Sequence, residues 1–121
     1  MQNAINWFEL PSTNFDRAVK FYSTVLGAEL QIIEMNGSKM AFFPTKDKGV
    51  GGCVIESENA VPSMEGALVY LNGGEDLSDP LDKVVGAGGT VLMPKTGIGE
   101  NGFIGIFKDS EGNRVAFHSM N

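Results

Sequence analysis

The hydrophobic residues of the first half change from the spacing of a strand to that of a helix. Residues 4–10 are mostly apolar or aromatic and stop at Pro11, which predicts a strand. A helix is expected to follow, with Thr13 or Asn14 as its N-cap and Gly27 as its end. The apolar residues that recur at helical spacing are Phe15, Val19, Tyr22 and Leu26.

Short strands fill the rest of the first half. Asn36-Gly37 is the residue pair of a type I′ hairpin turn, so it is expected to join two of them. A polar loop, residues 45–48, separates the second of these strands from the third. The predicted strands are residues 30–34, 40–43 and 51–56.

The second half repeats this order of elements. Asp76 or Ser78 is placed to cap a second helix, which Gly88-Gly89 would end. The apolar residues of that helix are Leu81, Val84 and Val85. The predicted strands are residues 67–71, 90–93, 103–107 and 114–118.

The two halves also correspond residue by residue, and Val19 falls on Leu81 at a constant offset. Each half therefore has the pattern of one βαβββ module, residues 1–57 and 58–121, within a single domain of residues 1–121. The apolar sheet face of each module has to be covered by the other, so the expected fold class is α+β.

The composition narrows the range of functions. A chain of 121 residues with 42% hydrophobic and 20% charged residues is typical of one globular domain. The net charge of −6, without a cluster of basic residues, argues against a nucleic-acid partner. Residues 1–4 lack the features of a signal peptide and no apolar run is long enough to span a bilayer, so we expect a cytoplasmic protein without membrane contact. Cys53 is the single cysteine and cannot form an internal disulfide.

Short motifs in both halves resemble those of one superfamily. They are WFELP at 7–11, AVKFY at 18–22, LVYLN at 68–72, MPKT at 93–96 and DSEGNR at 109–114. With them the chain resembles the vicinal oxygen chelate proteins, the glyoxalase, bleomycin-resistance and extradiol dioxygenase superfamily. The resemblance implies that the two modules curl into a half-open, mixed β-barrel around a central cavity. It also implies that two copies pair as a homodimer.

Metal-dependent members of this superfamily hold the ion with His, Glu or Gln from the first and last strand of each module. The resemblance puts these four positions at Trp7, Cys53, Leu68 and Ala116. Of the four, only Cys53 offers a metal ligand, and a lone thiolate is not a site for Zn²⁺, Fe²⁺ or Mn²⁺. We therefore place the chain in a glyoxalase-like subgroup without the metal site, and expect neither a metal nor another cofactor.

Because side chains two residues apart on a strand share a face, these positions point to further cavity residues. Glu9 and His118 are the predicted catalytic residues, a carboxylate and an imidazole that would move protons. A structural ion pair for Glu9 and a hydrogen-bonded or solvent-facing ring for His118 are the alternatives. The predicted substrate-binding residues are Trp7, Cys53, Leu68, Tyr70, Asn72, Phe103 and Ala116.

Two further features allow more than one interpretation. Cys53 is either an inert, small apolar side chain or, beside Gly51-Gly52, an accessible reactive thiol. Residues 97–102 match the pattern G-x-G-x-x-G, but a dinucleotide site needs a strand before the pattern and a helix after it. We expect residues 94–102 to form a flexible loop at the mouth of the cavity, which could act as a lid.

Three functions are consistent with these residues. In the first, the protein binds a small molecule in its cavity as a metal-independent isomerase or lyase, with Glu9 and His118 as acid and base. In the second, it sequesters a small aromatic or cationic compound without catalysis, as bleomycin-resistance proteins do, and its negative charge suits that role. The third is a scaffold or sensor without chemistry.

Overall fold

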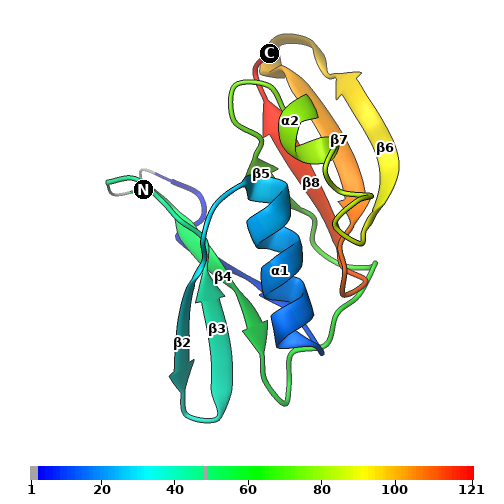
Figure 1. Cartoon of the computed structure of the whole chain (residues 1–121). Coiled ribbons are helices and arrows are strands. Elements are labelled where there is room, and N and C mark those ends of the chain that lie inside the picture. The colour runs from blue at the N-terminus through cyan, green and yellow to red at the C-terminus, as the bar shows by residue number, and fades with distance from the viewer. Residues whose placement is uncertain (1–2, 48) are drawn as a thin grey trace.

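Two four-stranded sheets, one from each half of the chain, form the body of the protein (Figure 1). The computed structural model describes residues 3–47 and 49–121. Three residues lie outside this description: Met1, Gln2 and Lys48. The first two belong to the segment considered above for a signal peptide, and Lys48 to the predicted polar loop. None of the described helices is long and apolar enough to cross a membrane.

The first sheet has the strand order β1-β4-β3-β2. Its parallel pair joins β1 to β4, and its other two pairs are antiparallel. Asn36 and Gly37 both have positive φ in the β2–β3 turn, as a type I′ turn requires, which confirms the predicted hairpin. The strands are β1 (Trp7–Pro11), β2 (Gln31–Met35), β3 (Ser38–Phe42) and β4 (Gly51–Glu56).

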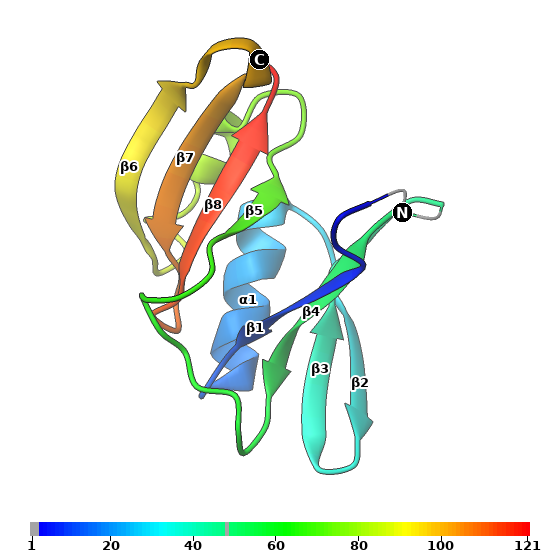
Figure 2. The same cartoon turned by 180° about the vertical axis from the view of Figure 1, so that it is seen from behind.

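The second sheet repeats this arrangement in the order β5-β8-β7-β6. Its β5 and β8 are parallel, and its other pairs are antiparallel. The edge strands β1 and β5 face each other near the middle of the molecule, so the two sheets together form an open, barrel-like curve (Figure 2). The strands are β5 (Val69–Asn72), β6 (Thr90–Gly97), β7 (Phe103–Lys108) and β8 (Arg114–Ser119).

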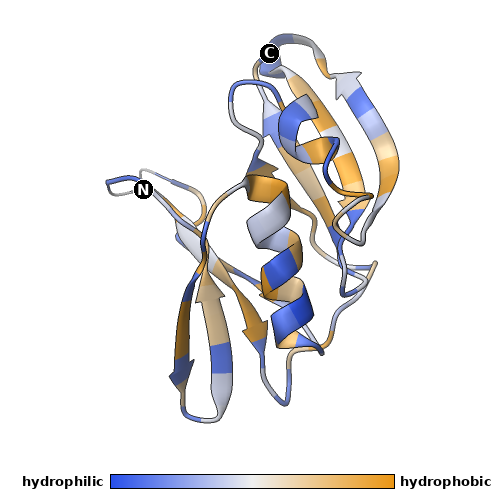
Figure 3. Cartoon of the chain, viewed as in Figure 1, coloured by the Kyte–Doolittle hydropathy of each residue, from blue (hydrophilic) through white to orange (hydrophobic). Residues whose placement is uncertain are grey.

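The first helix, α1 (Phe15–Leu26), begins and ends where the sequence predicts. Asn14 caps it, since its Oδ1 accepts the backbone N–H of Arg17 at 3.1 Å. Gly27 ends it in the left-handed conformation, with φ of 61°. Hydrophilic residues lie on the lower turns of α1 toward the viewer in Figure 3, while its apolar side packs on the strands behind.

The second helix, α2 (Ser78–Leu81), is much shorter than the sequence predicts. Beyond it the chain continues in turns with bonds to the third preceding carbonyl, such as the N–H of Val84 to the oxygen of Leu81 at 3.2 Å. Gly86 and Gly88 disfavour helix here, so the apolar contacts of Leu81 and Val84 are kept without a full helix.

The expected lid, residues 94–102, is another correction. Residues 94–97 continue β6, and a 3-10 turn, η1 (Gly99–Asn101), connects β6 to β7. Pro94 is tolerated because β6 is an edge strand with no ladder partner on its outer side. The segment is thus mostly part of a hairpin rather than a flexible loop.

The helices cover one face of each sheet and leave the other open. The core between α1 and the first sheet contains Leu10, Ala41 and Val54, and Phe107 and Phe117 lie in the core of the second half. Phe8 lies so close over Gly52 that a Cβ at that glycine would overlap its ring. Seen from behind, the other face of both sheets carries none of the described helices (Figure 2). We call this side the open face.

A buried carboxylate, Asp109, ties the two halves together. Its oxygens accept four hydrogen bonds: from the Tyr22 hydroxyl at 2.7 Å, from the backbone and side-chain nitrogens of Asn113, and from the backbone of Glu111. Asn113 Nδ2 also donates to the carbonyl of Pro11 at 2.7 Å, and this hydrogen bond connects the turn after β7 to the end of β1. Burial, followed by the charge of Asp109, raises the pKa of Tyr22, which keeps the phenol protonated as the donor.

Two further carboxylates hold the start of α1. Glu56 accepts the N–H of Phe15 at 3.0 Å, and Glu111 accepts the N–H groups of Thr13 and Asn14. Glu111 also pairs with Arg17, at 2.6 Å between Oε2 and Nε. Negative charge at a helix N-terminus interacts favourably with the helix dipole, so both sheets contribute to the placement of α1.

The hydroxyl of Tyr22 is expected to be important for stability. In Tyr22→Phe, Asp109 loses a charge-assisted hydrogen bond inside the core, which should cost roughly 1.5–3 kcal/mol. Chemical denaturation followed by circular dichroism measures the change. Tyr70→Phe is the control, because Tyr70 is 49% exposed and should change stability by less than about 0.5 kcal/mol. Equal effects of the two variants would contradict the role given to Asp109.

Glu111 should make stability depend on pH in the acid range. Burial raises its pKa, but the bonds from Arg17, Asn14 and Thr13 together outweigh burial and hold the pKa below its usual 4.5. The stabilisation is therefore present above that value and is lost as the pH falls through the folded-state pKa. Unfolding free energies measured from pH 7 to 3 should fall less steeply for Glu111→Gln than for the natural protein. If the free energies of unfolding of the two proteins changed with pH in parallel, these contacts would not lower the pKa of Glu111 in the folded protein.

Candidate functional site

On the open face of the first sheet, an acidic residue lies among aromatic side chains. The strand register pairs Glu9 with Cys53 and Cys53 with Phe42, so the three form a row across β1, β4 and β3. Trp7 precedes Glu9 on the same face, and its ring meets that of Phe42 edge-on, with centroids 5.6 Å apart. Trp7 remains 46% exposed, which leaves aromatic surface available beside a carboxylate.

Cys53 lies fully buried in the middle of this row. Burial, with a smaller effect of the Glu9 charge, raises the pKa of its thiol to about 11. The thiolate is the reactive form of cysteine, and it is scarcely populated near neutral pH at such a pKa. Of the two interpretations of Cys53, these properties favour the inert, apolar side chain.

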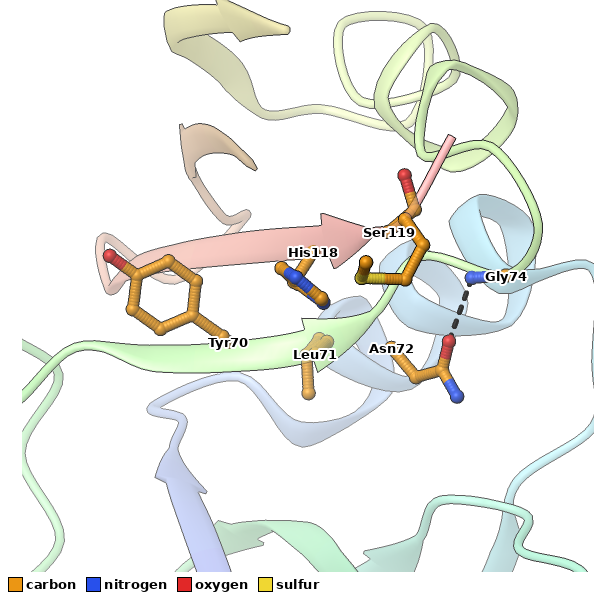
Figure 4. Close-up of a pocket in the computed structure, with 7 residues that line it drawn as sticks. Tyr70, Leu71, Asn72, Gly74, His118 and Ser119 are labelled. Carbon is orange, nitrogen blue, oxygen red and sulfur yellow. Dashed lines mark hydrogen bonds between the residues drawn. The ribbon is translucent and has the colours of Figure 1, made fainter. Parts of the chain in front are cut away.

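A pocket on the second sheet gathers three of the predicted residues. Tyr70 and Asn72 of β5 line it together with His118 of β8, in a volume of about 390 Å³ (Figure 4). The register explains this, since Asn72 is the partner of His118 and Tyr70 that of Ala116. Parity along the strands thus brings together the phenol, the amide and the imidazole.

The ring of His118 is held by the β6–β7 connection. Its Nε2 lies 2.6 Å from the carbonyl oxygen of Asn101 in η1. A carbonyl only accepts, so Nε2 carries the proton and Nδ1 of the neutral ring has its lone pair available. Asn101 was missed by the sequence reasoning, and the glycines on either side of it, Gly99 and Gly102, were its only signal, as turn residues.

Asn72 is oriented by its own backbone. Its Oδ1 accepts the N–H of Gly74 at 2.8 Å, an interaction drawn as a dashed line in Figure 4. This fixes the amide so that its nitrogen, a double donor, points away from Gly74. Asn72 therefore presents hydrogen-bond donors to whatever occupies the space beside β5.

The predicted residues form two groups rather than one. Trp7, Glu9 and Cys53 belong to the first sheet, and Tyr70, Asn72 and His118 to the second. Glu9 is not among the residues that line the pocket of His118.

Besides Trp7 and Cys53, three more of the predicted binding residues lie outside the pocket of His118. Phe103 pairs with Ser119, the neighbour of His118, and so faces the other side of the sheet, where Lys95 Nζ lies 4.6 Å from its ring centre. Leu68 lies just before β5, and Ala116 is fully buried.

The positions at which the superfamily resemblance puts metal ligands do not fit a metal ion. Trp7, Leu68 and Ala116 have no ligating atom, and the thiol of Cys53 is held protonated. Within residues 3–47 and 49–121, no group of three or more His, Cys, Asp or Glu side chains is arranged to hold one. These four positions therefore do not supply the ligand set of the metal-dependent members.

Comparison with known proteins agrees with this fold. A curated relative, a "Glyoxylase-like domain-containing protein" of Didymella fabae, is 31% identical over 96% of this chain and 93% of that protein. The crystal structure of a glyoxalase/bleomycin resistance protein from Albidiferax ferrireducens superposes with a TM-score of 0.72 at 12% identity, over 98% of this chain and all of that one.

A glyoxalase I variant of Zea mays superposes with a TM-score of 0.71 at 22% identity, over 93% of this chain. The chain spans 44% of that larger enzyme, which shows a shared fold rather than a shared activity. The family model described as "Glyoxalase/Bleomycin resistance protein/Dioxygenase superfamily" matches residues 4–117. The chain therefore belongs to the glyoxalase/bleomycin resistance protein/dioxygenase superfamily.

Proposed function

We propose that the protein binds a small aromatic cation on its open face, without needing a metal ion. The observation that carries this proposal is the carboxylate of Glu9 beside the exposed ring of Trp7. Neither of the ion pairs among the described residues involves Glu9, so its charge is available to a ligand. Flat aromatic surface next to a carboxylate suits a cation that also stacks.

The family supports a binding role in general terms. Its name includes bleomycin resistance proteins, and one of the structures with the same fold is named as such. Pairing of two copies would cover the open face and enclose a ligand between them, and we keep the homodimer and the cytoplasmic location as predictions.

A second candidate function is proton transfer on a small carbonyl compound. It is favoured by His118, whose Nδ1 lone pair is available in a pocket with the donors Tyr70 and Asn72. In that reaction Nδ1 takes a proton from the carbon next to the carbonyl, and the electron pair of the broken C–H bond moves through the carbonyl to its oxygen, giving an enolate stabilised by the donors. Return of the proton to the same carbon completes an exchange. Its return to the other carbon, with transfer of the hydroxyl proton to the former carbonyl oxygen, completes an isomerisation, and Glu9 is the second acid/base if a substrate spans both sheets.

Binding can be tested with matched probes that differ only in charge. Naphthalene-1-methylammonium should bind more tightly than naphthalene-1-methanol in calorimetric titrations. Glu9→Gln should weaken the ammonium by about three- to fivefold, since an exposed charge pair contributes roughly 0.6–1 kcal/mol, and leave the alcohol unchanged. Trp7→Ala should weaken both probes.

The control for this experiment is Glu34→Gln. Glu34 is an exposed carboxylate on β2, but it faces the opposite side of the same sheet. The proposal is wrong if Glu34→Gln weakens the ammonium as much as Glu9→Gln does, or if ammonium and alcohol bind equally well.

Catalysis can be tested by deuterium exchange, followed by NMR, on hydroxyacetone and glycolaldehyde in deuterium oxide. A general base contributes about 10²- to 10⁴-fold, so His118→Gln should reduce any protein-dependent exchange to the buffer rate. Glu9→Gln should lower turnover under this hypothesis but only affinity under the binding hypothesis. Exchange by the natural protein at the buffer rate would exclude the second candidate for these compounds.

A further inference from the structure

A second cavity lies between the two modules, and Asn72 is the one predicted residue that lines it. It has a volume of about 750 Å³. Its walls come from the end of α1 at Leu26 and the following Ala28, from residues 43–46 and 49–51, and from the end of β5 with the turn that follows. Small-molecule sites typically occupy 300–1,000 Å³ and form where two units meet. We call this space the inter-module cavity.

The floor of the inter-module cavity is apolar and partly aromatic. Phe8 and Phe43 contribute rings whose centroids are 5.4 Å apart at an angle of 33°, and Leu71 adds an aliphatic side chain from the second sheet. All three belong to or pack against the hydrophobic core, so the floor is rigid and formed in advance. Such a floor accommodates a flat apolar body of modest size.

The rim of the inter-module cavity carries positive charge in a negative protein. Lys46 contributes an ammonium group, whereas none of the lining residues is Asp or Glu, although the chain has 15 acidic and 9 basic residues. Lys46 belongs to neither of the ion pairs in the described part of the chain. Its charge is therefore available to an anion.

Two uncharged polar groups also line the cavity. Thr45 brings a hydroxyl, and Asn72 brings the amide nitrogen that remains after its oxygen has bonded to Gly74. An ammonium, a hydroxyl and an amide N–H are hydrogen-bond donors that match a carboxylate. Donors on the rim above an aromatic floor form the arrangement expected for an amphipathic acid.

We propose that the inter-module cavity binds a small carboxylic acid with an aromatic body, the ring on Phe8 and Phe43 and the carboxylate at Lys46. This site is separate from the cation site proposed above, which lies on the open face and depends on Glu9. The two sites therefore have opposite charge preferences, and each can fail without the other.

Naphthalene-1-carboxylate is the probe, compared with naphthalene-1-methanol and naphthalene-1-methylammonium. The carboxylate should bind at this site, and in ¹H–¹⁵N NMR spectra it should shift the amide signals of residues 26–28, 43, 45–47, 49–51 and 71–74. Lys46→Gln should weaken the carboxylate by about three- to fivefold and leave the shifts caused by the alcohol unchanged. Lys39→Gln is the control, because Lys39 is an exposed lysine of β3 outside the cavity.

A filled cavity gives an independent test. Val50→Trp places a ring in the space, and Ala28→Leu adds a branched aliphatic side chain from the helix side, so the second variant serves if the first does not fold. Either should abolish the shifts caused by the carboxylate, while Glu9→Gln leaves them in place. The proposal is overturned if the carboxylate shifts none of these amides, if Lys39→Gln weakens it as much as Lys46→Gln, or if a folded, filled variant still binds it.

Discussion

The buried carboxylate of Asp109 is the interaction on which the arrangement of the two halves depends. It lies in the turn before β8, yet its partners reach to α1 through Tyr22 and, by way of Asn113, to the end of β1. A buried charge is costly unless its oxygens are fully paired, so these groups can only come together in one relative position of the halves. The neighbouring Glu111 binds the start of α1, through the backbone N–H of Asn14 and the side chain of Arg17. One five-residue turn, 109–113, thereby sets the geometry of the open face and of the inter-module cavity.

The similarity of the two halves was visible in the sequence because each half has to bury apolar residues at the same spacing. Tyr22 in the first helical segment and Val84 in the second occupy equivalent positions, and both are fully buried. The lengths of the helices were not equivalent, because Gly86 and Gly88 replace helix-forming residues in the second half. Apolar spacing therefore predicted which residues are buried more reliably than the backbone form that buries them.

The candidate site was predictable as far as strand parity extends. Parity placed Trp7 with Glu9, and Tyr70 with Asn72, because the alternation of faces is a local property of a strand. Strand parity gives no distance between strands of different sheets. The sequence therefore could not show that Glu9 lies outside the pocket of His118. Phe103 was misplaced for another reason: residues 103–107 are apolar throughout apart from Gly105, and such a run does not show which face is buried. The inter-module cavity left no signal, since its walls come from three distant segments.

The contact of Phe8 with Gly52 has a consequence for the sequence variation that this protein can accept. The ring occupies the place where a side chain at that position would begin, and it is itself part of the wall between the core and the inter-module cavity. An alanine there, the smallest change on paper, would have to displace an aromatic ring of the floor. A larger exchange at the exposed Ile32 or Met35 would displace only water. Tolerance to mutation thus depends on local free space rather than on chemical similarity. A chemically small substitution at Gly52 would change the shape of the cavity even where the fold is kept.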